Sequence, residues 1–304
     1  MSAAMTPPAG IEAPGSLTRA EVESQPDIWA QVLAAAADLS RPLPEVGVPV
    51  LFVGCGTSYY IGESYARMRN TAGLGHTRAA IASEIPYIEQ AETVLLLSRS
   101  GTTTDVIRIA QRLRADHHVV GIVGEAGTPL VDLCHDVVLL NFADEKSIVQ
   151  TRFATAALTL LRASLGEDLT DLVPTGRAGL SLQLPATLPQ HTVFLGSDWT
   201  VGLAYEAALK CREAAGAWTE AYPIMEYQHG PIAVAGPHSL IWSLTPVPDF
   251  VRDSIAKTGA TLVEPDLDPQ AQLVAVHRLA LRLAEAAGRD PDRPNFLSRS
   301  VQLD

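Results

Sequence analysis

The chain has 304 residues, of which 47% are hydrophobic and 18% charged, and its formal net charge at pH 7 is −12. This apolar content excludes a disordered chain, and the length predicts about two domains, each able to bury a core. The excess of acidic residues argues against a nucleic-acid partner and against an anionic membrane, because both need a basic protein face. Net charge alone also disfavours an anionic small substrate.

The N-terminus and the cysteines predict where the protein works. Glu12 precedes the first basic residue, Arg19, so the start resembles neither a signal peptide nor a transit peptide. Residues 1–18 are predicted to be a disordered leader. The three cysteines are widely spaced, at Cys55, Cys134 and Cys211. Without CxxC or HxxxH spacing they favour a reducing cytoplasm, with no disulfide framework, metal or cofactor. Apolar runs are too short to span a membrane.

Short apolar runs alternate with helical patterns through the first half of the chain. The predicted strands are Val48–Gly54, Thr77–Ser83, Thr93–Ser98, His118–Val123 and Val137–Asn141. The predicted helices are Thr57–Ala72, Thr103–Ala115, Pro129–Cys134 and Ser147–Leu165. Strands that alternate with helices predict an α/β fold, with a parallel sheet covered on both faces.

The second half repeats this alternation after a group of helix breakers. Gly166 and Pro174-Thr175-Gly176 predict a domain boundary, with one domain over 19–170 and another over 177–304. The predicted strands are Val193–Gly196, Thr219–Tyr222 and Ser239–Thr245. The predicted helices are Trp199–Ala215, Phe250–Thr258 and one that Asp268 caps and that runs to about Ala287. The tail Arg289–Asp304 is predicted to be irregular.

The two halves also resemble each other in sequence. Three pairs recur at nearly constant offsets: Gly54 and Gly196 by 142 residues, Tyr65 and Tyr205 by 140, and Glu84 and Glu226 by 142. In the second pair each tyrosine follows a glycine by three residues. A near-constant offset favours a tandem duplication of one α/β unit, whose two sheets would enclose a ligand between them.

A glycine-rich turn follows the first strand and opens a helix, with the residues Gly54, Cys55, Gly56, Thr57 and Ser58. Glycines allow a tight turn, and a helix N-terminus directs free N–H groups at an anion. No lysine follows the glycines, so this is not a Walker loop. A plain strand-to-helix turn remains an alternative for this segment alone.

A second turn, after Thr93–Ser98, carries the stronger signal. Five hydroxyl side chains occur within the seven residues 98–104, among them Ser98, Ser100 and Thr103. Together with the N–H groups of a helix start, these hydroxyls could bind a phosphate, and Arg99 could add positive charge at the rim. A helix cap needs only one or two hydroxyls, so phosphate binding is favoured over simple capping.

A third set combines carboxylates, a lysine and a histidine. Glu206, Lys210 and Glu213 stand at i, i+4 and i+7 and therefore share one helix face. On an isolated helix this spacing is more typical of a solvated charged stripe. His229 precedes Gly230-Pro231 in a tight turn that could direct its imidazole into a cleft.

Four motifs together resemble the sugar isomerase (SIS) family: GCGTS, SRSGTTTDV, EAALKCRE and YQHGPIA. The chain is most similar to the isomerase half of glucosamine-6-phosphate synthases and to stand-alone isomerases and deaminases of hexosamine and ketose phosphates, over roughly residues 20–304. The resemblance implies two tandem SIS domains, each a parallel sheet sandwiched by helices in a flavodoxin-like, three-layer arrangement. It also implies a homodimer with sites near the subunit interface.

The resemblance assigns roles to individual residues. Phosphate or sugar binding is implied for Gly56, Thr57, Ser58, Ser98, Arg99, Ser100 and Thr103. Glu213 matches the base that moves a proton between C1 and C2 of the open-chain sugar. His229 matches the residue that opens the sugar ring, reaching over from the neighbouring subunit. Glu206 and Lys210 match helical residues near the sugar.

Two positions depart from the family pattern. Its synthases carry a C-terminal lysine that binds the ketose carbonyl as an imine, whereas this chain has Arg299, which is retained as an expected substrate contact. Arginine stays protonated and cannot form that imine. A Thr-Lys pair common after the fifth strand is Thr151-Arg152 here. No glutaminase-like segment is recognised, so glutamine-driven synthesis is not expected of these residues.

Three outcomes remain open for the chemistry that the resemblance implies. Loss of the C2 proton gives an enediol or enolamine, which can be protonated to a ketose or, through an imine, release ammonia. With an N-acyl group the same intermediate can eliminate the 3-hydroxyl, as in a dehydratase acting on N-acetylglucosamine 6-phosphate. The sequence favours an isomerase or deaminase of glucosamine 6-phosphate or a related hexose phosphate. A non-catalytic sugar-phosphate sensor is the alternative from another class.

Overall fold

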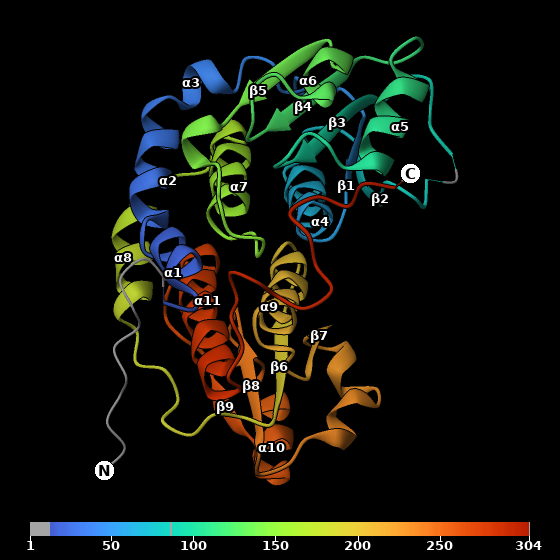
Figure 1. Ribbon diagram of the computed structural model, residues 1–304. Helices are drawn as coiled ribbons and strands as arrows, with labels where there is room; N and C mark the ends of the chain where they lie inside the picture. Colours follow the sequence, from blue (N-terminus) through green and yellow to red (C-terminus); the bar gives the residue numbers. More distant parts are fainter. Residues whose placement is uncertain (1–12, 86, 304) are drawn as a thin grey trace.

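Two parallel sheets form the framework of the protein (Figure 1). The computed structural model describes residues 13–85 and 87–303. The first sheet has the order β2-β1-β3-β4-β5, with β1 Val50–Gly54, β2 Thr77–Ile81, β3 Thr93–Ser98, β4 Val119–Val123 and β5 Asp136–Leu139. The second has the order β7-β6-β8-β9, with β6 His191–Gly196, β7 Thr219–Pro223, β8 Ser239–Ser243 and β9 Thr261–Val263. The predicted strands are confirmed, and β9 is an additional edge strand.

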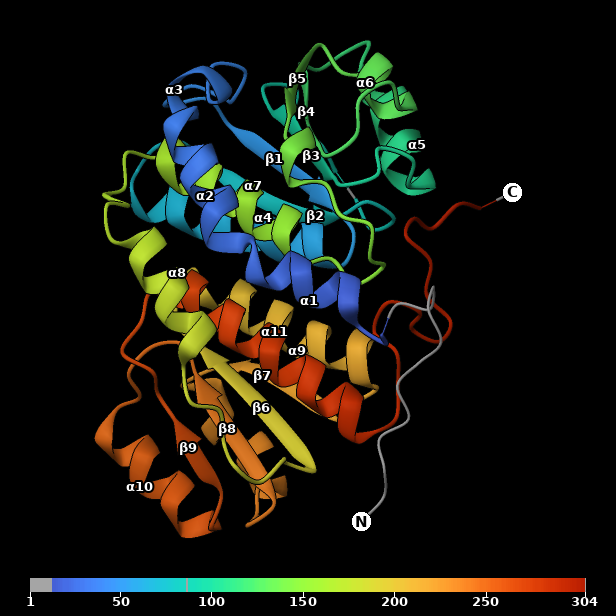
Figure 2. The ribbon, with the colours of Figure 1, turned by 60° about the vertical axis from the view of Figure 1, so that its left-hand side comes forward.

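Helices fill the space between the sheets and cover their outer faces (Figure 2). Between the sheets lie α2 (Gln25–Ala34), α4 (Thr57–Thr71), α7 (Arg152–Ser164), α9 (Thr200–Ala215) and α11 (Pro269–Ala286). On the outer faces lie α5 (Thr104–Leu113) and α6 (Pro129–Leu133) over the first sheet, and α10 (Asp249–Thr258) over the second. Short 3-10 turns span Asn141–Ala143 (η1), Glu226–Gln228 (η2) and Pro231–Val234 (η3).

The alternation of side chains along the strands explains this layering. In β1, Leu51 and Val53 face the outer helices, while Phe52 faces inward. Phe52 belongs to one hydrophobic cluster with Phe194 and Trp242 of the second sheet. The inner faces of the two sheets therefore share one apolar cluster, while the outer face of each sheet has its own, and the α/β fold class is confirmed.

The N-terminal segment is more ordered than the sequence predicts. Residues 1–12 of the predicted leader lie outside the described residues, but helix α1 (Ser16–Glu23) begins inside it. The carboxylate of Asp292 explains this order, because it accepts hydrogen bonds from the backbone of Leu17 at 3.0 Å and of Thr18 at 2.8 Å. A side chain 274 positions away thus caps the helix. Helices α2 and α3 (Ala36–Leu39) were also not predicted.

Helix α8 (Leu172–Ser181) spans the breakers that predicted a domain boundary. Pro174 lies in its first turn, where a missing N–H costs no helical hydrogen bond. Gly176 packs against Trp29 of α2, and a Cβ at this glycine would lie 2.4 Å from the indole ring. The segment is therefore a packed connection between the two sheets, and the breakers do not form a loop.

The two halves meet where α4 crosses α9. A Cβ at Gly202 would lie 2.5 Å from the carbonyl oxygen of Tyr60, so only glycine permits this close approach. Next to the crossing, the rings of Tyr60 and Tyr205 stack with centroids 5.6 Å apart. The crossing brings the start of α4 beside the polar face of α9. None of the helices over residues 13–85 and 87–303 is both long and apolar enough to cross a membrane.

Candidate functional site

A cavity of about 240 Å³ opens where β1 and β3 end, between the first sheet, α9 and the C-terminal segment. The ends of parallel strands are the usual place for ligands in α/β folds. Nine of the residues expected at the site line this cavity: Gly56, Thr57, Ser58, Ser98, Arg99, Ser100, Thr103, Glu213 and Arg299. The cavity therefore joins the turns of the first half to the charged helix of the second.

The turn Ser98–Thr103 presents hydroxyl groups to the cavity. Ser98 Oγ accepts a hydrogen bond from the Gly101 N–H at 3.2 Å, and Ser100 Oγ accepts one from the Thr102 N–H at 3.2 Å. Because both oxygens act as acceptors within the turn, their O–H groups remain available as donors. Helix α5 starts directly after Thr103, and its dipole favours an anion at this end.

The three charged residues of α9 form a row in which Glu206 and Lys210 are buried and Glu213 is partly exposed. Lys210 is 1% exposed, and its Nζ lies 3.5 Å from Glu206 Oε1 and contacts Glu213 Oε2 on the other side. Burial works to lower the pKa of Lys210, but the charges of Glu206 and Glu213 outweigh it and raise this pKa above its usual value. The solvated charged stripe that the spacing alone favoured is therefore wrong.

Glu206 is as deeply buried as Lys210. Burial, only partly opposed by the charge of Lys210, raises the pKa of Glu206 to about 7. Its Oε1 accepts a hydrogen bond from Thr57 Oγ1 at 3.2 Å. In the part of the chain that the structure describes, Glu206 Oε2 has no hydrogen-bond partner. Such a carboxyl can hold a proton near neutral pH, which suits acid–base chemistry.

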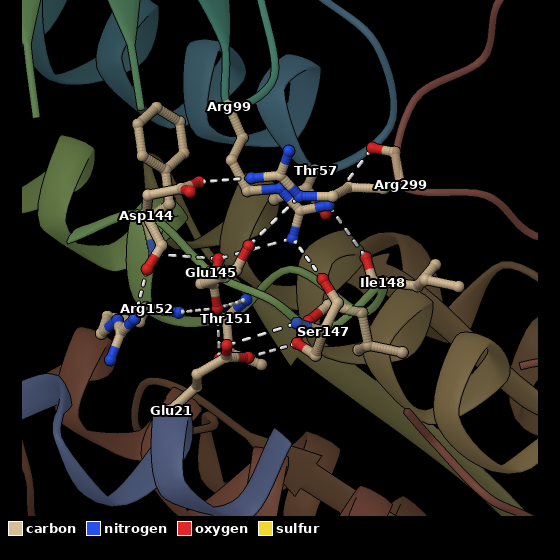
Figure 3. Close-up of polar contacts among 12 residues, drawn as sticks. Glu21, Thr57, Arg99, Asp144, Glu145, Ser147, Ile148, Thr151, Arg152 and Arg299 are labelled. Atoms are coloured by element: carbon tan, nitrogen blue, oxygen red, sulfur yellow. Dashed lines mark hydrogen bonds and ion pairs between the residues drawn. The ribbon is translucent and has the colours of Figure 1, made fainter. Parts of the chain in front are cut away.

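Arg99 differs from its expected position at the rim. It is only 3% exposed, and its guanidinium donates to the carbonyl oxygens of Ser147 at 2.9 Å and Ile148 at 3.2 Å (Figure 3). It also donates to the carbonyl oxygen of Arg299 at 3.2 Å and lies 3.8 Å from Glu145. Arg99 therefore joins two backbone segments that border the cavity, and these bonds occupy much of its donor capacity.

Arg299 lies in the C-terminal segment that crosses the cavity. Its guanidinium binds Glu125 at 3.0 Å and Asp144 at 2.6 Å. Burial alone would lower the pKa of Arg299, but these two carboxylates raise it further above its usual value. Through these two ion pairs, Arg299 attaches the C-terminal segment to the first half of the protein.

His229 does not line the cavity. It follows η2, beyond the end of β7, and its side chain is exposed. Within one chain the structure therefore does not bring His229 to Glu213.

The structure adds residues that the sequence analysis missed. The helix predicted from Ser147 begins only at Arg152, where Glu145 accepts the first N–H groups, and the residues before it form a loop. Ile148 and Gln150 of this loop line the cavity, as do the apolar residues Phe296, Leu297 and Val301 of the C-terminal segment. Gln150 Oε1 is buried, and no described residue bonds to it. The only signal in the sequence was the neighbouring pair Thr151-Arg152. Over the described residues, no three His, Cys, Asp or Glu side chains are grouped to hold a metal ion.

Comparison with protein families and curated proteins points to one family. Residues 49–165 match the family model described as the SIS domain. This match covers the first sheet and stops before the second, so the second predicted SIS domain stays a prediction. The glutamine–fructose-6-phosphate aminotransferase of Thermus thermophilus is 25% identical in sequence over an alignment that covers 83% of this chain. That of Aeropyrum pernix is 27% identical over 84% of this chain. The chain spans about half the length of these relatives, 52% and 51%.

Solved structures share the fold. A glucosamine-6-phosphate deaminase from Thermotoga maritima superimposes with a TM-score of 0.82 at 24% identity, covering 95% of this chain and all of that one. A tagatose-6-phosphate ketose/aldose isomerase from Escherichia coli gives a TM-score of 0.73 at 17% identity, over 92% of this chain and 96% of that one. At these identities the likeness concerns the fold.

Proposed function

Residues 49–165 form a SIS domain, and from this premise we propose that the protein is an isomerase or deaminase of an amino-sugar 6-phosphate such as glucosamine 6-phosphate. One observation carries the proposal: the Ser98–Thr103 turn and Glu213 line the same cavity, although they come from different halves. A phosphate donor set and a carboxylate base are the two parts that this chemistry needs. The names of the relatives and structural neighbours agree with this class.

In the proposed complex, the phosphate lies against the hydroxyl groups of Ser98, Ser100 and Thr103. These donors and the start of α5 act at short range, so they bind a phosphate in spite of the net charge of −12. The other end of the open-chain sugar then points toward α9. A cavity of about 240 Å³ suits a molecule of this size better than a nucleotide.

Glu213 is the proposed base. Its carboxylate removes the C2 proton of the open-chain aldose. The electron pair of this C–H bond forms the C1–C2 double bond of an enolamine, while the π pair of the C1 carbonyl moves to O1, which takes up a proton from the solvent. The same carboxyl returns its proton at C1, and the nitrogen lone pair forms the C=N bond as one amine proton passes to the solvent, which leaves a ketimine at C2. Water adds to the ketimine, and ammonia leaves with formation of the ketose. Lys210 orients Glu213 through their ion pair and places a positive charge beside the reacting carbons.

Arg299 supports ammonia release over ammonia transfer through a protein-bound imine. An imine needs a neutral amine, and the pKa of the guanidinium is too high to provide one. Arg299 is in addition paired with Glu125 and Asp144. We therefore assign it to holding the C-terminal segment over the sugar.

A homodimer would complete the site with His229 of the neighbouring subunit as the ring-opening residue. In support, large apolar side chains flank this histidine in sequence and are strongly exposed: Trp218 at 60%, Met225 at 55% and Val234 at 53%. Apolar side chains that are exposed in one region are typical of subunit interfaces.

The reaction is tested by incubating the protein with glucosamine, glucose and N-acetylglucosamine 6-phosphates in heavy water. Proton NMR should show loss of the C2 proton signal of glucosamine 6-phosphate, and an ammonia assay should show stoichiometric release. Formation of a ketose from glucose 6-phosphate, with no ammonia released from glucosamine 6-phosphate, would indicate an isomerase that is not a deaminase. An unsaturated product from the N-acetyl sugar would mark a dehydratase. Binding without exchange at C2 would contradict an enzyme and favour a sensor.

The dimer is tested by mixing two inactive variants, E213Q and H229Q, under conditions that exchange subunits. If His229 acts on the neighbouring site, half of the dimers are mixed and each of these has one intact site, so about a quarter of the activity returns. If His229 acted within its own chain, no mixed dimer would be active. The parent variants assayed separately are the controls.

A further inference from the structure

The loop of residues 144–151 forms one wall of the cavity through Ile148 and Gln150. Glu145 closes this loop: its Oε1 accepts from the Thr151 N–H at 2.7 Å and the Arg152 N–H at 2.7 Å, and its Oε2 accepts from the Phe153 N–H at 3.1 Å. These bonds secure the end of the loop where α7 begins. The middle of the loop, where Ser147 and Ile148 lie, depends on other partners.

Glu21 of helix α1 is one of those partners (Figure 3). Its Oε1 accepts hydrogen bonds from the backbone N–H groups of Lys146 at 2.6 Å and Ser147 at 3.3 Å, and its Oε2 contacts Ser147 Oγ. Arg99 binds the same stretch of backbone through the carbonyl oxygens of Ser147 and Ile148. The N–H group of Ser147 is thus bound by the Glu21 carboxylate, and its carbonyl oxygen is bound by the Arg99 guanidinium.

Helix α1 is itself anchored to the C-terminal segment. Asp292 accepts hydrogen bonds from the backbone of Leu17 and Thr18 and from Thr18 Oγ1, one turn before Glu21. The same C-terminal segment continues to Arg299 and crosses the cavity. Helix α1 therefore connects two walls of the site although none of its own residues touches the cavity.

Glu21 and Glu145 are both buried carboxylates that repel each other, with the Arg99 guanidinium 3.8 Å from Glu145. Burial and then the charge of Glu145 raise the pKa of Glu21 above its usual value. A buried pair of like charges is easier to understand where a defined backbone position is needed. Here that position is the wall beside Gln150, whose buried oxygen is free to meet a ligand.

We propose that Glu21 is a positioning residue of the site: through Lys146 and Ser147 it sets the position of Ile148 and Gln150 against the sugar. The proposal rests on the proposed function. It concerns the sugar portion only, because the phosphate donors come from the separate turn after β3.

Three variants test this: E21A, E21Q and, as control, E23A. Glu23 is exposed on the same helix, so E23A removes the same charge without touching the loop. For E21A we expect KM for glucosamine 6-phosphate to rise about tenfold, since small displacements of positioning groups have effects of this order. The inhibition constant of inorganic phosphate should stay within about twofold, because phosphate alone needs only the turn after β3. E21Q keeps an acceptor for both N–H groups and should restore KM to within about threefold of wild type.

Hydrogen exchange separates failure of this inference from failure of the proposed function. In E21A the amides of Lys146 and Ser147 should exchange at least about tenfold faster than in wild type and E23A, with no ligand present. Faster exchange with unchanged KM would show that Glu21 is merely structural and would overturn the inference. Equal changes of KM and of the phosphate constant would also overturn it. A wild-type protein that neither binds nor turns over any of the three sugar phosphates would overturn the proposed function, and this inference with it.

Discussion

The two sheets of the molecule begin alike but differ where their strands end. In both, the first strand ends in a glycine, Gly54 or Gly196, whose Cβ would lie within 2.6 Å of the backbone at the start of the next helix. Two residues later the backbone of each half adopts a positive φ, 52° at Gly56 and 48° at Asp198. The second turn therefore has a carboxylate where the first has a glycine.

The turns that follow β3 and β8, the strands beside β1 and β6 in the two sheets, also differ in their ability to bind an anion. β3 is followed by the hydroxyl groups of Ser98–Thr103, whereas β8 leads through Pro246 to Pro248, which caps α10. Prolines have no N–H to offer an anion, and Asp198 would repel one. This difference fits the function that we propose, in which the two halves have separate roles. In that proposal the first half binds the phosphate, and the charged residues of α9 in the second half carry out the acid–base chemistry.

The largest expected effect concerns the contribution of the second half. E213Q removes the proposed base and leaves the cavity shape, so the rate of C2 exchange should fall by about 10²- to 10⁴-fold. The NMR assay in heavy water measures this rate. E285Q, which changes an exposed carboxylate of α11, is the matched control and should be as active as wild type. If E213Q exchanged the C2 proton as fast as wild type, Glu213 of α9 would not be the base.

The pH dependence of stability tests the burial of the same row. Because the folded pKa of Glu206 is about 7 and its ordinary value is 4.5, its stabilising effect is complete below pH 4.5 and is lost as pH rises through 7. The free energy of unfolding of wild type, relative to E206Q, should therefore fall by about 3 kcal/mol from pH 4.5 to pH 8. Urea unfolding at several pH values measures it. A constant difference would mean that Glu206 is not protonated in the folded protein.

A carboxylate placed in the first half should make it resemble the second. S100D keeps an acceptor for the Thr102 N–H but sets a negative charge against the phosphate, so KM should rise at least about 100-fold. D198G removes the carboxylate from the first turn of the second half and should leave KM unchanged. Steady-state kinetics compare the two. Equal effects, or an effect of D198G alone, would place the phosphate in the other half.

The smallest effect is expected at the crossing of the two halves. In G202A the new Cβ meets the carbonyl oxygen of Tyr60 and Ser64 Oγ, which should lower the free energy of unfolding by about 2 kcal/mol. Gly236 has open space around its Cβ position, so G236A should change stability by at most about 0.5 kcal/mol. Chemical denaturation distinguishes them. Equal stability of both variants would argue against the tight crossing of α4 and α9.

Local patterns were enough to predict most of the fold. The apolar runs of β1 and β3 are buried on both faces, which is why hydrophobicity alone locates them. Helices α1 and α8 were missed because long-range contacts stabilise them. Asp292 caps α1, and Gly176 of α8 packs against the ring of Trp29. Such partners lie far away in the chain and leave no local pattern.

The candidate site also contains residues that local motifs predicted and residues that they missed. The hydroxyl turn and Glu213 were predicted because each belongs to a short motif, and both line the cavity. Arg99 was expected at the rim, but a buried guanidinium needs several acceptors, and carbonyl groups 48 and 200 positions away supply them. Ile148, Gln150 and the C-terminal segment reach the cavity only through folding, so composition and spacing could not indicate them.

A crystal structure with 2-amino-2-deoxyglucitol 6-phosphate, an open-chain analogue that cannot react, tests most directly that the two halves act on one molecule. The account predicts phosphate oxygens within about 3 Å of Ser98, Ser100 and Thr103 hydroxyls, and the C2 carbon within about 3.5 Å of Glu213. A phosphate bound elsewhere, or a C2 atom beyond the reach of Glu213 with the phosphate in that turn, would contradict it.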